Sequence, residues 1–99
     1  MIEYNDQAVI FFELKLGNAE MPYGQKIALK RIADNNQKAG KHCAILVCEH
    51  DVYDCNKDIK ADLAIVRDFY YAGRWYKDGK RTAKQVLDSF ITFCDKNPF

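Results

Sequence analysis

The first part of the chain places two apolar segments on either side of a polar turn, which predicts a β-hairpin. Residues 1–5 form a short segment, and residues 8–16 form a longer one with the sequence AVIFFELKL. Asn5-Asp6-Gln7 lies between them, and Asn and Asp tolerate the backbone conformations of tight turns. Gly17-Asn18 ends the second segment. We therefore expect strands at 1–5 and 8–16, followed by a loop to residue 21.

A helix is predicted between Pro22 and about Ala39. Proline suits the first turn of a helix, and Gly40 is a natural stop after the last turn. Gln25 is expected on the side that faces the sheet. Residues at helical spacing predict the rest of that side: Ala28, Leu29, Ile32, Ala33 and Asn36. Four basic residues are expected mostly outside it: Lys26, Lys30, Arg31 and Lys38.

Residues 42–48, HCAILVC, are almost continuously apolar, a pattern typical of a central strand buried on both faces. A strand, a helix and a strand with short connections favour a right-handed crossover. Residues 8–16 and 42–48 are therefore expected to be parallel neighbours. Glu49-His50-Asp51 closes the second of these strands, and residues 51–58 read as a polar loop.

The last third of the chain predicts a second hairpin and a helix. Residues 59–71 fit either a helix or a strand, and their β-branched and aromatic content favours a strand at 62–71, paired with 74–77. Thr82-Ala83-Lys84-Gln85 has the pattern of a capping box, which starts a helix. The apolar stripe of this helix is Val86, Leu87, Phe90, Ile91 and Cys94.

Composition indicates one α/β domain over residues 1–99. With 48% hydrophobic and 13% aromatic residues, the 99-residue chain has enough apolar surface for one core. Its net charge of +1 gives no overall attraction to nucleic acid, so DNA binding would need a local patch. We find no signal peptide and no apolar stretch of the ~20 residues that span a bilayer, so we expect a cytoplasmic protein without a membrane partner.

Glu13 and Lys15 are the most informative residues of the chain. They lie two apart in an apolar strand, so their side chains leave the same face, and charges in such a strand are usually paired or hold a metal. A solvated ion pair on an edge strand is the simpler alternative. Gln25 opens the next helix, and Glu49-His50 ends the next strand. Because sites in open α/β sheets form beyond the carboxyl ends of the strands, we expect these groups to converge there.

Such a cluster suits the hydrolysis of a phosphodiester. Glu13 and the backbone carbonyl of Leu14 are candidate ligands for Mg²⁺, which prefers one or two carboxylates with water completing its shell. The metal would polarise the phosphate. Lys15 would position water or balance the developing charge, and Gln25 would orient water or phosphate as a neutral donor.

The order of these elements resembles the PD-(D/E)xK, or restriction-endonuclease-like, superfamily. The segments Phe12-Glu13-Leu14-Lys15 and Met21 to Leu29 are similar to those of its small phage and prophage members. The resemblance implies a DNA nuclease dependent on Mg²⁺ or Mn²⁺, with catalytic Glu13, Lys15 and Gln25. The Asp that usually provides the first metal ligand in this superfamily, on the preceding strand, has no counterpart here, and Glu3 is the nearest substitute. The usual helix before the hairpin is also missing.

A second hypothesis is that this fold has lost its chemistry and binds a protein, such as a host enzyme or defence complex. The near-zero net charge and the missing Asp favour it. The strand edge exposed by the short front end also makes a homodimer plausible.

Other polar residues have structural explanations as well as functional ones. Cys48, His50 and Cys55 fit a zinc site poorly, so the four cysteines are expected to be free thiols and Cys43 and Cys48 to lie in the core. His50 suits a general base or a loop hydrogen bond. Two further sets remain open between binding and structure: the loop acids Asp51, Asp54 and Asp58, and the basic residues Lys77, Lys80, Arg81 and Lys84. The aromatic cluster of Phe69, Tyr70, Tyr71, Trp75 and Tyr76 suits base stacking or hairpin packing.

Overall fold

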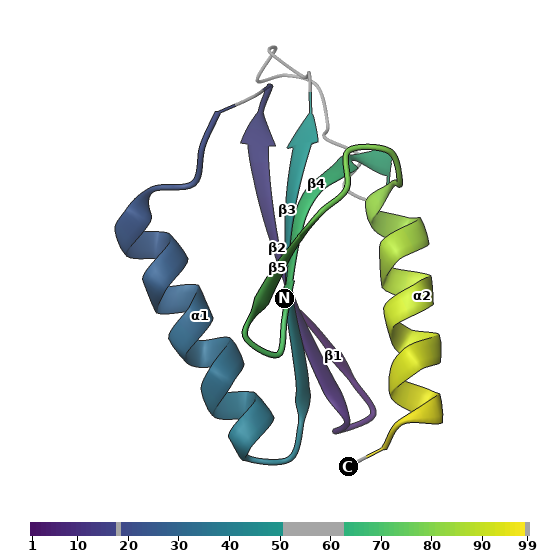
Figure 1. Ribbon diagram of the computed structural model, residues 1–99. Coiled ribbons are helices and arrows are strands. Elements are labelled where there is room, and N and C mark those ends of the chain that lie inside the picture. Colours follow the sequence, from purple (N-terminus) through teal and green to yellow (C-terminus); the bar gives the residue numbers. More distant parts are fainter. Residues whose placement is uncertain (18, 51–62, 99) are drawn as a thin grey trace.

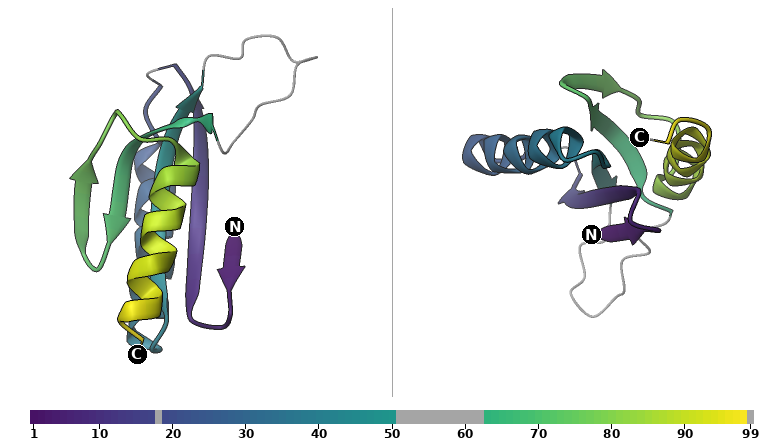
Figure 2. Two further views of the ribbon diagram at one scale, coloured as in Figure 1. Left: turned by 90° about the vertical axis from the view of Figure 1, so that its right-hand side faces the viewer. Right: turned by 90° about the horizontal axis from the view of Figure 1, so that it is seen from below.

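The computed structural model describes residues 1–17, 19–50 and 63–98, which form a mixed sheet with one helix on each face (Figure 1). Seen from below, α1 and α2 lie on opposite sides of the strands (Figure 2). The elements within the described ranges are β1 (Ile2–Tyr4), β2 (Ala8–Leu16), α1 (Tyr23–Lys38), β3 (His42–His50), β4 (Ile65–Tyr71), β5 (Arg74–Lys77) and α2 (Ala83–Lys96). The predicted α/β class and mixed sheet are confirmed.

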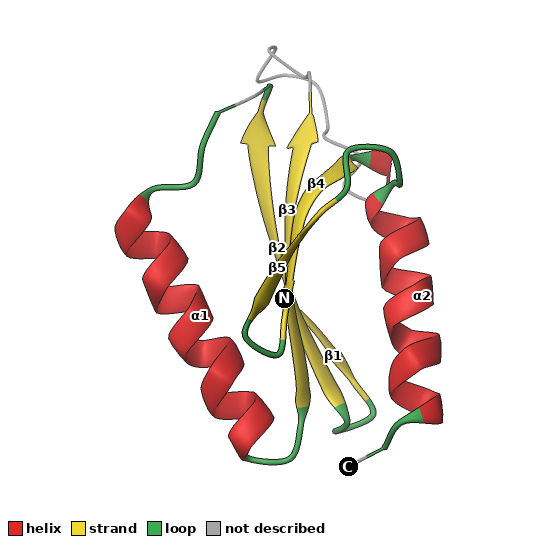
Figure 3. Cartoon of the chain, viewed as in Figure 1, coloured by secondary structure: helices red, strands yellow, loops and turns green. Residues whose placement is uncertain are grey.

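The strands lie in the order β1-β2-β3-β4-β5, and β2 and β3 are parallel as predicted. The other neighbouring pairs are antiparallel. In this register Glu13 lies beside Val47 and Lys15 beside Glu49. The carboxyl ends of β2 and β3 therefore meet at one edge of the sheet, beside the start of α1 (Figure 3).

The turns explain where most of the elements end. Asn5 and Asp6 have φ angles of 48° and 57°, the left-handed conformation that the Asn-Asp pair was expected to supply. Gly40, with φ of 84°, follows α1 where a stop was predicted. β3 continues two residues past its expected end, because its pairing with β2 extends through His50. β4 begins at Ile65 rather than residue 62, which lies outside the described residues, and the helical alternative is wrong for 65–71.

The core has two layers, one on each face of the sheet. β3 is buried from His42 to Cys48, so the prediction of a central strand is confirmed. The α2 layer contains Ala8, Ile10, Ala44, Leu46, Cys48, Ala64, Val66, Ala83, Val86, Phe90 and Cys94. The α1 layer is smaller and contains Ala33, Cys43, Ile45, Val47 and Tyr70.

The predicted inner face of α1 is partly wrong. Ile32 is 42% exposed and Ala28 is exposed, whereas Ala33 is the helix's fully buried residue. Lys26 and Lys30 lie toward the sheet instead, with their ammonium groups 4.8 Å from the ring centroid of Trp75 and 5.8 Å from that of Tyr70. Each ammonium group lies over the face of its ring, which is the geometry of a cation–π contact. The expectation that lysine side chains face outward therefore predicts the wrong rotation of α1 about its own axis.

The C-terminal helix follows its prediction closely. Thr82 accepts a hydrogen bond from the Gln85 backbone N–H, and the Gln85 side chain accepts one from the Thr82 N–H, so the capping box is confirmed. The far end of α2 is held to β3 by buried His42, whose Nε2 lies 2.6 Å from the Asn97 carbonyl oxygen. Neither of the two helices in the described ranges is long and apolar enough to cross a membrane.

Candidate functional site

Glu13, Lys15 and Gln25 come together on the face of the sheet that α1 covers. The odd-numbered positions Val9 and Phe11 of β2 pack in the α1 layer, so strand alternation directs Glu13 and Lys15 the same way. The Lys15 Nζ lies 3.0 Å from Glu13 Oε1 and donates to Gln25 Oε1 at 3.5 Å. The side chains of Lys15 and Glu13 are only 17% and 22% exposed, so the pair is largely covered rather than fully solvated.

The end of β3 adds a second carboxylate to this neighbourhood. Glu49 is the register partner of Lys15, and His50 is that of Leu16. Neighbouring residues of parallel strands share a face, so Glu49 leaves the sheet on the α1 side next to Lys15. The His50 carbonyl oxygen accepts a hydrogen bond of 2.7 Å from the Gly17 N–H, which joins the two strand ends. The expected convergence of β2 and β3 is therefore present.

Glu3 does not belong to this cluster. The antiparallel register places Glu3 beside Val9, and β1 begins opposite Ile10. Val9 is four residues from Glu13, or about 13 Å along an extended strand. The Glu3 carboxylate instead accepts a hydrogen bond from the Asp6 N–H. The tight turn sets this register, and it keeps Glu3 far from the other candidate ligand.

The acidic side chains are few for a metal centre. Within the part of the chain that the structure describes, no group of three or more His, Cys, Asp or Glu residues is placed to hold a metal ion. The carboxylates near Lys15 are Glu13 and, by register, Glu49. Mg²⁺ is often held by one or two carboxylates together with water and substrate phosphate. Glu13 and Glu49 fit that mode of binding. Among the described residues they are too few to surround a metal ion with protein ligands alone.

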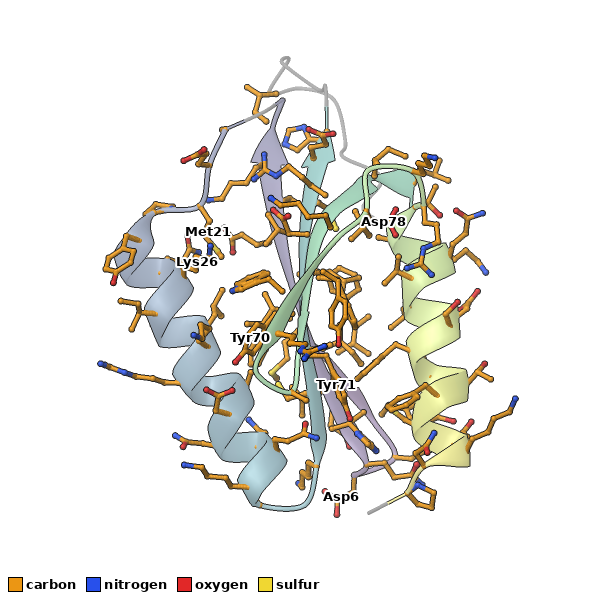
Figure 4. The ribbon with its side chains drawn as sticks, viewed as in Figure 1. Asp6, Met21, Lys26, Tyr70, Tyr71 and Asp78 are labelled. Carbon is orange, nitrogen blue, oxygen red and sulfur yellow. The ribbon has the colours of Figure 1, made fainter. Side chains whose placement is uncertain are left out.

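A cleft of about 430 Å³ opens beside the cluster, between the start of α1 and the β4–β5 hairpin. Val47 lies between the cluster and the β4–β5 hairpin, because its register partners are Glu13 on β2 and Asp68 on β4. Figure 4 shows Met21 and Lys26 directed toward this side of the sheet. The residues that line the cleft are Glu20, Met21, Lys26, Val47, Arg67, Asp68, Trp75 and Lys77.

A β-bulge shapes the far wall of the cleft. Val47 pairs with Asp68 but Cys48 pairs with Val66, so Arg67 is an extra residue in β4. The bulge allows two consecutive residues, Arg67 and Asp68, to line one cleft, which strict alternation forbids. Asp68 lies 3.5 Å from the Arg67 Nε and 3.3 Å from the Lys77 Nζ. No sequence pattern indicates Asp68 or Lys26 as site residues, because a bulge and a helix rotation leave no periodic signal.

The remaining candidates have structural roles or lie outside the described residues. Cys43, Cys48 and Cys94 are buried free thiols, and burial raises the pKa of each to about 11, which disfavours the thiolate that zinc requires. In the basic stretch, Asp78 binds Arg81 through a 2.8 Å ion pair and accepts two backbone hydrogen bonds. The residues proposed from sequence that fall outside the description are Asp51, Asp54, Cys55 and Asp58.

The chain matches no protein-family model, no curated protein and no solved structure.

Proposed function

We propose that this protein is a phage-type, metal-dependent nuclease of the PD-(D/E)xK kind, hydrolysing phosphodiester bonds in DNA. The observation that carries the proposal is the juxtaposition of Glu13, Lys15 and Gln25 beside a cleft. These groups come from separate elements, and their combination of acid, base and neutral amide suits hydrolysis. The location at the carboxyl ends of two parallel strands is where open α/β sheets place their sites.

Each of the three residues has a defined task in this proposal. Glu13, with the Leu14 carbonyl, would hold Mg²⁺ or Mn²⁺, which supplies polarisation of the phosphate when bound. Lys15 balances the negative charge that develops on the phosphate, and its contact with Gln25 fixes the direction of its ammonium group. The Gln25 amide group orients the attacking water. Glu49, the register partner of Lys15, would provide a second carboxylate near the metal.

The test is cleavage of labelled single-stranded, duplex and branched DNA with Mg²⁺ and with Mn²⁺. We expect cleavage by the native chain, and a loss of about 100-fold or more in Glu13→Gln and in Lys15→Met. Asp88→Asn and Lys84→Met are matched controls, because they remove the charges of another 3.0 Å ion pair, on the exposed side of α2. The controls should cleave as the native chain does.

Two results would contradict the nuclease proposal. One is a folded Glu13→Gln variant that cleaves at the native rate. The other is a native chain that cleaves none of the three substrates with either metal.

A second candidate function is a protein-binding module, including a second copy of this chain. β1 pairs with Ala8–Ile10 only, so within the described ranges no strand covers that edge of β2 from Phe11 to Leu16. An uncovered edge can add a strand from another chain. Sedimentation of the native chain at increasing concentration tests the homodimer. A monomer at every concentration would exclude it.

A further inference from the structure

The cleft beside Glu13 combines one aromatic ring with several charged side chains in its lining. One wall is the indole of Trp75, and the rim carries Lys26, Arg67 and Lys77. Glu20 and Asp68 are the acidic residues of the lining, and Asp68 pairs with both Arg67 and Lys77. Three cationic side chains against two carboxylates leave the lining a net charge of +1, which a phosphate would share with Asp68. A volume of about 430 Å³ lies within the range of small-molecule sites. An aromatic wall with a cationic rim suits a ligand that has a flat ring and an anionic group.

Trp75 is held firmly in its position on β5. Its cross-strand partner is Tyr70, and the two ring centroids are 5.0 Å apart. Tyr70 is itself fixed from the other side, because its hydroxyl donates to Asp34 Oδ1 at 2.6 Å. The indole is therefore presented by a rigid sheet rather than by a loop, and a ligand that stacks on it loses little to rearrangement.

Lys26 occupies the position that a stacked ring would take. Its ammonium group lies 4.8 Å from the Trp75 ring centroid, and the residue is exposed. A phosphate at the rim competes for this ammonium, because a charge-assisted bond to phosphate is stronger than an exposed cation–π contact. Movement of the flexible lysine toward phosphate would uncover the indole for a base. One residue thus links recognition of the anion to recognition of the ring.

We propose that this cleft binds one unpaired nucleotide, with its base on Trp75 and its phosphate at Lys26, Arg67 and Lys77. The inference deepens the proposed function, because Val47 lines the cleft and is the register partner of Glu13, so the bound strand would run toward that carboxylate. It assigns the substrate class as single-stranded or frayed DNA. Binding in the cleft requires no metal and no cleavage, which makes it separately testable.

The experiment uses the fluorescence of Trp75, which is the chain's one tryptophan. The full chain is titrated in EDTA with deoxyadenosine monophosphate, with a short single-stranded oligonucleotide and with the matching duplex. We expect saturable quenching by the first two, weaker quenching by the duplex and a loss of affinity at high salt. Lys26→Met should weaken binding about tenfold, and Trp75→Leu should weaken binding of a labelled oligonucleotide at least fivefold.

Lys30→Met is the matched control. Lys30 lies one helical turn from Lys26 and its ammonium group is over Tyr70, but it does not line the cleft. Its removal should change affinity less than twofold. Four results would overturn the inference: no quenching, equal effects of the two lysine variants, tighter binding of the duplex, or equal quenching by an acidic peptide. Cleavage without quenching would overturn this inference alone, whereas quenching without cleavage would overturn only the proposed function.

Discussion

The two faces of the sheet differ in how much of their covering helix is buried. α2 buries Ala83, Val86, Phe90 and Cys94 against its face, whereas α1 fully buries Ala33 alone. Each face also has a cleft of about 430 Å³. Five of the ten residues that line the cleft of the α2 face are aromatic, whereas five of the eight that line the cleft of the α1 face are charged. The comparison indicates that the α2 face is the more tightly packed of the two and that the α1 face keeps more charged surface beside its cleft.

Adjacent tyrosines on β4 send their rings to opposite faces of the sheet, and the Tyr71 hydroxyl also accepts a hydrogen bond of 3.3 Å from Gln37 of α1. Tyr70 points toward α1 and Tyr71 toward α2 (Figure 4). Tyr71 packs among aromatic rings and its hydroxyl lies 2.6 Å from buried His42 Nδ1. Tyr70 binds the half-buried carboxylate of Asp34 and supports Trp75. One pair of neighbouring residues therefore serves packing on one face and positioning on the other.

The largest expected effect comes from removing the main aromatic anchor of the α2 face. Phe90 is 5% exposed, and its ring contacts those of Phe69 and Tyr71. Phe90→Ala should lower the free energy of unfolding by about 3–5 kcal/mol. Leu29→Ala, at the half-buried equivalent on α1, should cost about 1–2 kcal/mol. Urea unfolding measures both, and equal losses would contradict the difference in packing between the two faces.

Removing the hydroxyl groups of Tyr70 and Tyr71 compares the stability contributed by one hydrogen bond on each face. Tyr71→Phe removes the hydroxyl beside buried His42, at a cost of about 1–3 kcal/mol. Tyr70→Phe should cost about 1 kcal/mol, because water can reach the Asp34 carboxylate. Thermal unfolding of the two variants at neutral pH gives the order. A larger loss for Tyr70→Phe would show that the α1 face contributes more to stability than its packing indicates.

A further expected effect is a pH dependence at Asp78, in the connection from β5 to α2. Hydrogen bonds from the Arg81 and Lys80 backbone N–H groups and from the Arg81 side chain lower its pKa to about 2. The charged form is thus favoured by folding, and its contribution is present above pH 3.8 and is lost as the pH falls toward 2. Urea midpoints of the native chain and Asp78→Asn should differ at pH 6 and converge near pH 2. A constant difference would contradict this assignment.

The positions of helices and strands along the chain were easier to predict than the side of each element that faces the sheet. β2, β5 and the capping box of α2 were placed correctly because alternation, a glycine turn and a cap are local signals. The rotation of α1 was misplaced, since Lys26 and Lys30 cover aromatic rings that belong to distant strands. No local pattern records a contact between residues that are 40 or more positions apart.

The candidate site shows the same limit. The meeting of Glu13, Lys15 and Gln25 was predictable, because strand alternation and a short connection fix it. The position of Glu3 was not, because it depends on the hairpin register rather than on spacing. The cleft depends on a bulge in β4, and a single extra residue leaves no trace in the hydrophobic pattern.

The two-residue turn between β4 and β5 governs what each face receives. Ala72 and Gly73 have φ angles of 50° and 86°, which close the hairpin so that Tyr71 pairs with Arg74. The pairing that this turn fixes places Trp75 opposite Tyr70, on the α1 side, and Tyr76 opposite Phe69, on the other side. A shift of this pairing by one residue would exchange Trp75 and Tyr76 between the two faces. The cleft would then have a phenol where it now has an indole, without a change in any residue of the strand.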